Sequence, residues 1–246
     1  MAEFDRMAAN TVGTQGRAAE IDQGLRAHMI SVYNYLAGGL FVAAGTAFAF
    51  GTNAMLAQAV WGSPLKWAVI FAPLALIFFI SFRLQKMSVA AVQATYWVFT
   101  VLMGISLSMV FIRYAGDYTA IVQAFGVTAV SFLGLSLYGY TTKRNLSGMG
   151  SFLIMGVIGL IVASIANIFI GSSALAFGIS VIGVLIFAGL TAYDTQRIKM
   201  EYLQYAQAGM TASAQMSKAA VMGALGLFLN FVNMFQFILA LTGGND

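Results

Sequence analysis

The sequence of 246 residues has no cysteine, only 2 prolines and very few charged side chains. The absence of cysteine excludes disulfides, thiolate metal sites and cysteine nucleophiles. Charged residues make up 8% of the chain and hydrophobic residues 60%, whereas soluble domains carry about 25% charged residues. So few charges cannot cover a globule of this size with a water-compatible surface. The composition therefore excludes a soluble enzyme, a nucleic-acid-binding protein and a disordered chain, and it predicts a multi-pass membrane protein in contact with the lipid bilayer.

Uncharged runs divide the chain into helices. The runs 29–65 and 145–193 are too long for one crossing of a hydrocarbon core of about 30 Å, because a helix rises about 1.5 Å per residue. Gly62-Ser63-Pro64 interrupts the first run and Gly171-Ser172-Ser173 the second. The sequence thus predicts an all-α membrane protein with helices at 30–52, 65–83, 87–112, 118–142, 149–170, 174–194 and 219–241. A polar segment, 195–218, separates the last two of these seven transmembrane helices.

The basic residues predict the orientation. If the amino terminus is cytoplasmic, all of the 12 lysines and arginines except Lys66 and Arg113 lie on the inner side. This bias agrees with the rule that cytoplasmic loops are rich in basic residues. Seven crossings then place the carboxyl terminus, at Asp246, outside.

Residues 1–28 are polar and of mixed sign, without the basic and apolar regions of a cleavable signal peptide. We interpret them as a cytoplasmic tail and 29–246 as a single transmembrane domain. Ile21, Leu25 and Met29 recur every four residues, so a short amphipathic helix on the inner surface is an alternative to a solvated tail.

No enzyme chemistry has a complete set of residues. Ser136 follows a G-x-S pattern, but the only histidine, His28, precedes the first predicted helix and cannot act as its base. Asp194 has no second carboxylate inside any predicted helix, as an aspartyl protease would need. Ligands for a metal hydrolase and a phosphate-binding loop are also missing. We therefore expect neither an enzyme nor a cofactor.

Two features of the last two helices indicate a functional path. Asp194 ends the predicted sixth helix, where it either faces the bundle interior or is solvated beside Arg197. One stripe of the seventh helix, within about 80° of arc, carries small and amide residues, while its opposite face is apolar. The stripe consists of Gly223, Gly226, Asn230 and Asn233, with Gln236 continuing it. Because amides are unfavourable against lipid, we expect the stripe to face protein, either as helix-packing contacts or as a polar path.

Two motifs carry a family resemblance. Residues 188–199, Ala-Gly-Leu-Thr-Ala-Tyr-Asp-Thr-Gln-Arg-Ile-Lys, are followed by Leu-Phe-Leu-Asn-Phe-Val-Asn-Met-Phe at 227–235. Together they resemble the Bax inhibitor-1 family, and the resemblance covers essentially the whole chain. It implies six helices wrapped around a central seventh, a bacterial inner-membrane location and a pH-sensitive calcium leak channel.

The same resemblance implies the site residues. The family's helix-six aspartate maps onto Asp194, and an arginine that latches onto it maps onto Arg83. The second aspartate of the family's pair falls on Asn230, and this departure removes the pair that would sense pH. We therefore expect Asp194 to stay ionised between pH 6 and 8 and any ion flux to vary little over that range. The predicted boundaries place Asn230 about 16 Å deeper than Asp194, so either the sixth helix runs deeper or the two do not meet.

Two functions follow as hypotheses. The first is an inner-membrane cation leak channel, for calcium, whose gate and ion path involve Asp194, Asn230, Arg83 and Asn233. Calcium would bind weakly to Asp194 and Asn230, because one carboxylate and an amide carbonyl are hard ligands with little charge. The alternative is an interaction protein that modulates a membrane-anchored AAA+ protease through residues 1–28. The sequence leaves the oligomeric state open.

Overall fold

The computed structural model describes residues 2–210 and 213–243, with side chains from residue 19 onward. Within these residues the chain is helical and has no strand. The helices are α1 (Ala2–Thr52), α2 (Ala54–Trp61), α3 (Leu65–Arg83), η1 (Leu84–Lys86), α4 (Val89–Arg113), α5 (Thr119–Thr141), α6 (Ser147–Ile170), α7 (Ser173–Gln207) and α8 (Ala214–Thr242). In the described part of the chain, 7 helices are long and apolar enough to cross a membrane, and α2 is a short helix on the α1–α3 connection. The predicted all-α fold with seven spans is confirmed.

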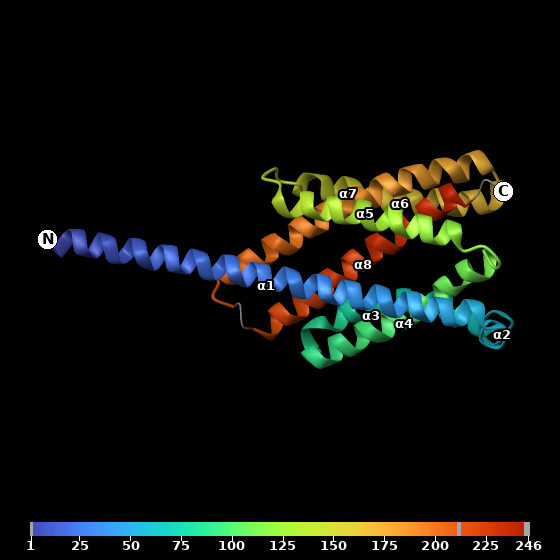
Figure 1. The fold of residues 1–246 in the computed structure, drawn as a ribbon, viewed down its shortest axis with the longest axis horizontal. Coiled ribbons are helices and arrows are strands. Elements are labelled where there is room, and N and C mark those ends of the chain that lie inside the picture. Colours follow the sequence, from blue (N-terminus) through green and yellow to red (C-terminus); the bar gives the residue numbers. More distant parts are fainter. Residues whose placement is uncertain (1, 211–212, 244–246) are drawn as a thin grey trace.

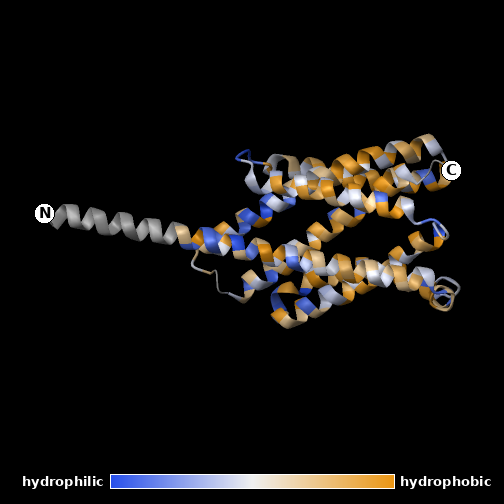
Figure 2. Cartoon of the chain, in the orientation of Figure 1, coloured by the Kyte–Doolittle hydropathy of each residue, from blue (hydrophilic) through white to orange (hydrophobic). Residues whose placement is uncertain are grey.

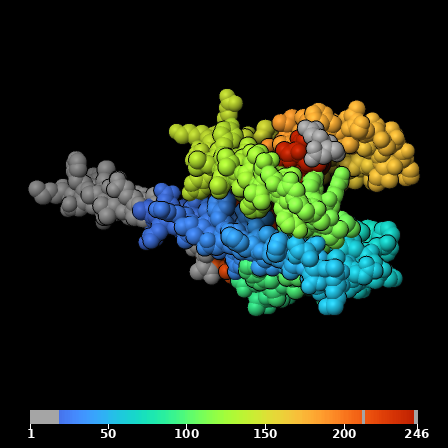
Figure 3. Space-filling view, turned by 45° about the vertical axis from the view of Figure 1, so that its right-hand side comes forward, coloured from blue at the N-terminus to red at the C-terminus, as the bar shows by residue number. Residues whose placement is uncertain are grey.

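The helices form two groups with α8 between them (Figure 1). Helix α1 packs along α4, and α3 packs on α4, whereas α5 and α6 both pack on α7. Helix α8 contacts α7, α1, α5 and α4, and it is the most deeply buried of the seven spans. Helix α3 packs chiefly on α4, and α6 packs chiefly on α7. That all six helices enclose α8 therefore stays a prediction. Figure 3 shows the end of α8 (red) between α5 and the α6–α7 pair.

Hydrophilic residues gather at the ends of the bundle and hydrophobic residues along its middle (Figure 2). This distribution is the one expected of helices that cross a bilayer, because lipid solvates apolar side chains and water the charged ones. The end that carries Arg83, Lys143 and Lys218 is called the basic end below. Asp246 lies outside the described residues.

The boundary between the last two spans is the main correction to the predicted elements. The segment 195–218 was expected to be a polar connection, but α7 continues to Gln207 and α8 begins at Ala214. Ile198, Tyr202 and Ala206 are buried and follow one another at intervals of four residues, so α7 keeps an apolar face beyond its first charged residues. The charges lie on the other faces and do not stop the helix.

Helix α1 is continuous across the predicted division at residue 28. Leu25, His28 and Met29 are buried, and the ring centroids of His28 and Tyr202 on α7 are 5.2 Å apart. The last part of the segment 1–28 therefore packs against the bundle. That residues 1–28 act as a cytoplasmic tail stays a prediction.

Candidate functional site

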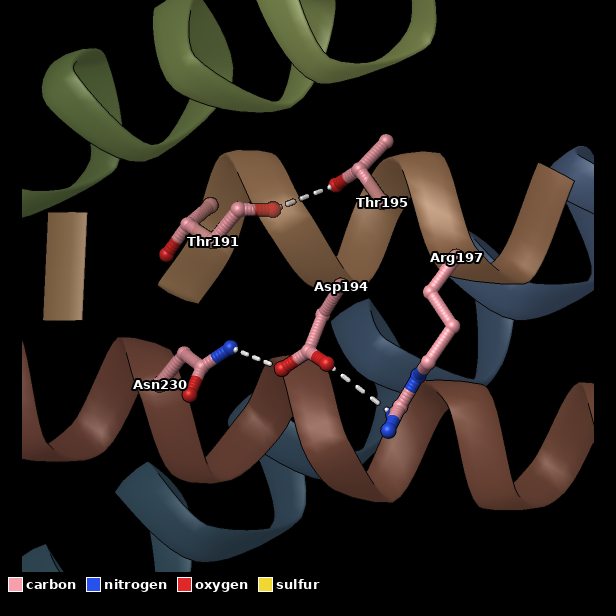
Figure 4. Close-up of polar contacts among 5 residues, drawn as sticks. All are labelled: Thr191, Asp194, Thr195, Arg197 and Asn230. Carbon is pink, nitrogen blue, oxygen red and sulfur yellow. Dashed lines mark hydrogen bonds and ion pairs between the residues drawn. The ribbon is translucent and has the colours of Figure 1, made fainter. Parts of the chain in front are cut away.

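Asp194 and Asn230 meet directly in the interior. The Asn230 side-chain nitrogen Nδ2 donates a hydrogen bond of 2.7 Å to Oδ2 of Asp194 (Figure 4). Asp194 is 8% exposed and Asn230 4% exposed. Helix α7 continues about 20 Å past Asp194, and α8 begins about 24 Å before Asn230. The expected difference in depth therefore came from ending the sixth helix too early, and the two side chains lie at the same level.

Arg197 is the cationic partner of Asp194. Its Nη2 lies 3.0 Å from Oδ1 of Asp194, one turn away on the same helix, and its guanidinium lies 5.9 Å from the centre of the Tyr193 ring. The Arg197 side chain is 53% exposed, so it reaches from the buried carboxylate toward the basic end. Asp194 thus has a donor on each oxygen: an amide on one and a guanidinium on the other (Figure 4). Charge-assisted contacts of this kind stabilise an ionised carboxylate.

Arg83 does not occupy the place that the resemblance implied. It is exposed at the end of α3, and among the described residues the ion pair of Asp194 is with Arg197. Two physical reasons account for this: α3 packs chiefly on α4, and Arg197 already occupies the carboxylate from its own helix. The latch between Arg83 and Asp194 is not formed in this structure.

A cleft of about 680 Å³ lies between α6, α7 and α8. Its polar lining consists of Asp194, Arg197, Asn230, Asn233 and Ser164. The wall that α6 contributes is otherwise apolar and is made by Ile154, Val157, Leu160, Ile161, Ile165 and Ile168. A membrane-level cleft with one polar side can hold polar ligands or ions against otherwise lipid-like walls.

The polar stripe of α8 faces protein only in part. Asn230 is buried, whereas Asn233 is half-buried at the cleft and donates from Nδ2 to the Leu229 carbonyl at 2.8 Å. Gln236 is exposed. The expectation that the whole stripe faces protein is therefore wrong for its outer part, because α6 packs on α7 and leaves this side of α8 open. On the opposite, apolar face, Val232 is buried.

A second, more polar pocket of about 600 Å³ adjoins the cleft toward the basic end. Both are lined by Tyr193 and Arg197, so the ion pair with Asp194 lies at their junction. Gln196 fixes α7 at this level: its Oε1 accepts from the Leu146 N–H and its Nε2 donates to the Arg144 carbonyl, both at 2.8 Å. This pocket was not predicted, because its residues converge only when α7 continues as a helix beyond Asp194.

The remaining polar groups of this region make structural bonds. Thr195 donates to the Thr191 carbonyl at 2.8 Å (Figure 4) and lies 3.3 Å from the hydroxyl of Ser136. Among the described residues, no group of three or more histidine, cysteine, aspartate or glutamate side chains comes together to hold a metal ion. A cation at Asp194 would therefore depend on one carboxylate with amide and backbone oxygens.

Residues 25–246 match the model of the family described as "Inhibitor of apoptosis-promoting Bax1". The chain belongs to the Bax inhibitor-1 family. Its relatives in this family include an uncharacterized protein of Caulobacter vibrioides, which is 45% identical over 100% of this chain and 99% of its own length. The Escherichia coli inner membrane protein YbhL is 36% identical over 89% of this chain and 92% of its own. An uncharacterized membrane protein of Streptococcus pyogenes is 34% identical over 92% and 96%. These similarities agree with a multi-pass membrane protein.

Proposed function

We propose that this protein is a cation leak channel of the inner membrane, with calcium as the ion, and that the path runs along α8 past Asp194 and Asn230. The observation that supports it is a buried carboxylate at the junction of a membrane-level cleft and a polar pocket. Ionisable residues at membrane depth are unfavourable and mark ion pathways when they line such cavities. The Asn230 and Asn233 carbonyl oxygens are further ligands that calcium accepts.

The chemistry of this site predicts weak and transient binding, as conduction requires. Asp194 is the one carboxylate among the residues that line the cleft, and its charge is balanced by Arg197. A single carboxylate attracts a cation without holding it. Arg83, exposed at the basic end, would act on ions only at the entrance. We expect neither catalysis nor a resident cofactor.

Calcium flux into proteoliposomes tests the proposal. Wild type should conduct above protein-free vesicles and should change little between pH 6 and 8. Asp194→Asn should lower the flux, because it removes the attracting charge and leaves the guanidinium of Arg197 in the path. Asp22→Asn, which removes the same charge from an exposed position, is the control and should conduct like wild type. No flux above protein-free vesicles at any pH from 6 to 8 would contradict the channel.

The alternative proposal is modulation of a membrane-anchored AAA+ protease through the amino-terminal segment. Helix α1 has 51 residues and is about 76 Å long, whereas the hydrocarbon core is about 30 Å thick, so much of α1 lies outside it. Deletion of residues 2–20 separates the two functions. A channel should keep its flux, and a protease modulator should lose its effect on the turnover of other membrane proteins.

A further inference from the structure

We infer that Arg197 is a tethered counter-ion that moves between Asp194 and a second carboxylate, Glu201, and so closes and opens the path. This inference rests on the proposed function, because it describes how the same site is gated. It assigns the gate to a single side chain of α7 and requires no movement of a helix.

The closed position is the one observed. The guanidinium of Arg197 contacts Asp194 at 3.0 Å and occupies the side of the carboxylate that an arriving cation would need. Gly226 on α8 lies beside this pair: a Cβ atom there would make only ordinary contacts, 3.8 Å from Nη2 of Arg197 and 4.0 Å from Oδ2 of Asp194. The path is therefore filled at this level by a positive charge that belongs to the protein.

The open position is one turn further toward the basic end. Residues four apart on a helix lie on the same face, so Glu201 is a neighbour of Arg197 on the side away from Asp194. Arg197 and Glu201 line the same polar pocket, and the half-exposed arginine side chain already reaches into it. A change of side-chain rotamer can therefore transfer the guanidinium from one carboxylate to the other.

The order of the charges along α7 makes the closed position the resting one. An acidic residue that precedes its basic partner along a helix gives the stronger pair, and the reverse order gives a weaker one. Asp194 precedes Arg197, whereas Glu201 follows it. A cation that reaches Asp194 competes with the guanidinium, and Glu201 then accepts the displaced charge, so that the region stays electrically balanced.

Two substitutions separate the two positions. Glu201→Gln removes the second partner and should lower calcium flux by about two- to fivefold, the size expected for a partly exposed ion pair. Arg197→Gln removes the tethered charge but keeps a hydrogen-bond donor for Asp194, and it should raise the flux. It should also increase the affinity of the purified protein for Mn²⁺ by about tenfold, as expected for the loss of one charged hydrogen bond. Arg197→Lys keeps the charge and should raise the flux less than Arg197→Gln does.

Matched controls remove the same charges elsewhere at the basic end. Lys143→Gln and Asp22→Asn are at exposed positions and should leave flux and Mn²⁺ affinity unchanged. The gain of affinity in Arg197→Gln should disappear when Asp194→Asn is added, which shows that the metal binds at this carboxylate. Each variant is first compared with wild type by size-exclusion chromatography, and Glu201→Gln, at a half-buried position, keeps the inference testable if Arg197→Gln does not fold.

The outcomes distinguish the inference from the channel. If wild type conducts but Glu201→Gln conducts equally and Arg197→Gln does not conduct more, the channel stands and the movable counter-ion is overturned. If no variant conducts, the channel is wrong, and the Mn²⁺ affinity then decides the place of Arg197. If Arg197→Gln binds Mn²⁺ about tenfold more tightly than wild type, the guanidinium of Arg197 occupies the cation position at Asp194. If the two affinities are equal, the inference is overturned.

Discussion

A close approach of two helix backbones near the site provides a quantitative prediction. Gly139 on α5 lies against Ala192 on α7, two residues before Asp194. A Cβ atom at Gly139 would lie 2.9 Å from Cα of Ala192 and still closer to its carbonyl oxygen, whereas ordinary contact begins at 3.4 Å. Because these are backbone atoms, no rotamer change relieves the contact. Gly139→Ala must therefore separate α5 from α7 by about 0.5 Å or more.

The loss of stability caused by Gly139→Ala can be estimated by comparison with Gly134 on the same helix, where a Cβ atom would meet nothing within 4 Å. Both alanine substitutions have the same gain in helix propensity, about 1 kcal/mol, and only Gly139→Ala adds an overpacking penalty of about 1–3 kcal/mol. The difference between the variants is then the penalty alone. At about 2–4 °C per kcal/mol for a chain of this size, Gly139→Ala should melt about 2–12 °C below Gly134→Ala.

Thermal unfolding of both variants in one detergent checks this value, and calcium flux shows whether the shift at Ala192 reaches Asp194. Flux should change in Gly139→Ala and stay unchanged in Gly134→Ala. If Gly139→Ala melts at or above Gly134→Ala, the backbone approach does not limit the packing and the reasoning is refuted.

Three further predictions concern single side chains. Asn230→Asp places a second carboxylate against an existing one and should introduce a pH dependence of flux between pH 6 and 8 that wild type lacks; flat profiles for both in identical vesicles would contradict it. Lys218 donates from Nζ to the Leu84 carbonyl at 3.1 Å, so Lys218→Met should lower the free energy of unfolding by about 0.3–1 kcal/mol, with a smaller effect in high salt. Hydrogen bonds from the side chain and backbone of Thr119 lower the pKa of Asp117, in the α4–α5 connection. Ionised Asp117 therefore stabilises the start of α5 above its ordinary pKa, and this support is lost as pH falls through the lowered value; an NMR titration midpoint no lower than in an unfolded peptide would contradict this.

Much of the fold could be predicted because charges rarely lie inside a bilayer. The uncharged runs and their turns placed every span, and 65–83 coincides with α3. The same rule failed at the end of α7, because a charged residue ends a membrane span without ending a helix. Buried Tyr202 and Met216 lie beyond the predicted ends and continue the packing of α7 and α8.

The contact between α7 and α8 at the site could be predicted from the sequence, whereas the positions of α3 and α6 around it could not. Asp194 and Asn230 were expected from the motifs, and the structure brings them together. Deciding whether Arg83 or Arg197 pairs with Asp194 required the position of α3 in the bundle. The apolar sequence of α3 does not allow this position to be predicted. Helix α6 has mostly apolar residues on all its sides, so its sequence does not clearly distinguish the face against α7 from the one that lines the cleft.

The deep burial of α8 has a consequence for biosynthesis. Helix α8 follows the other six spans in the chain, so the ribosome delivers the most buried span after the helices that pack against it. Until α8 inserts, the faces of α1, α4, α5 and α7 that pack against it lack this helix as a partner, and Asp194 has no amide partner. Assembly of this bundle must therefore wait for its centre, and a chain interrupted before α8 would leave a charged, unfilled intermediate exposed to membrane quality control.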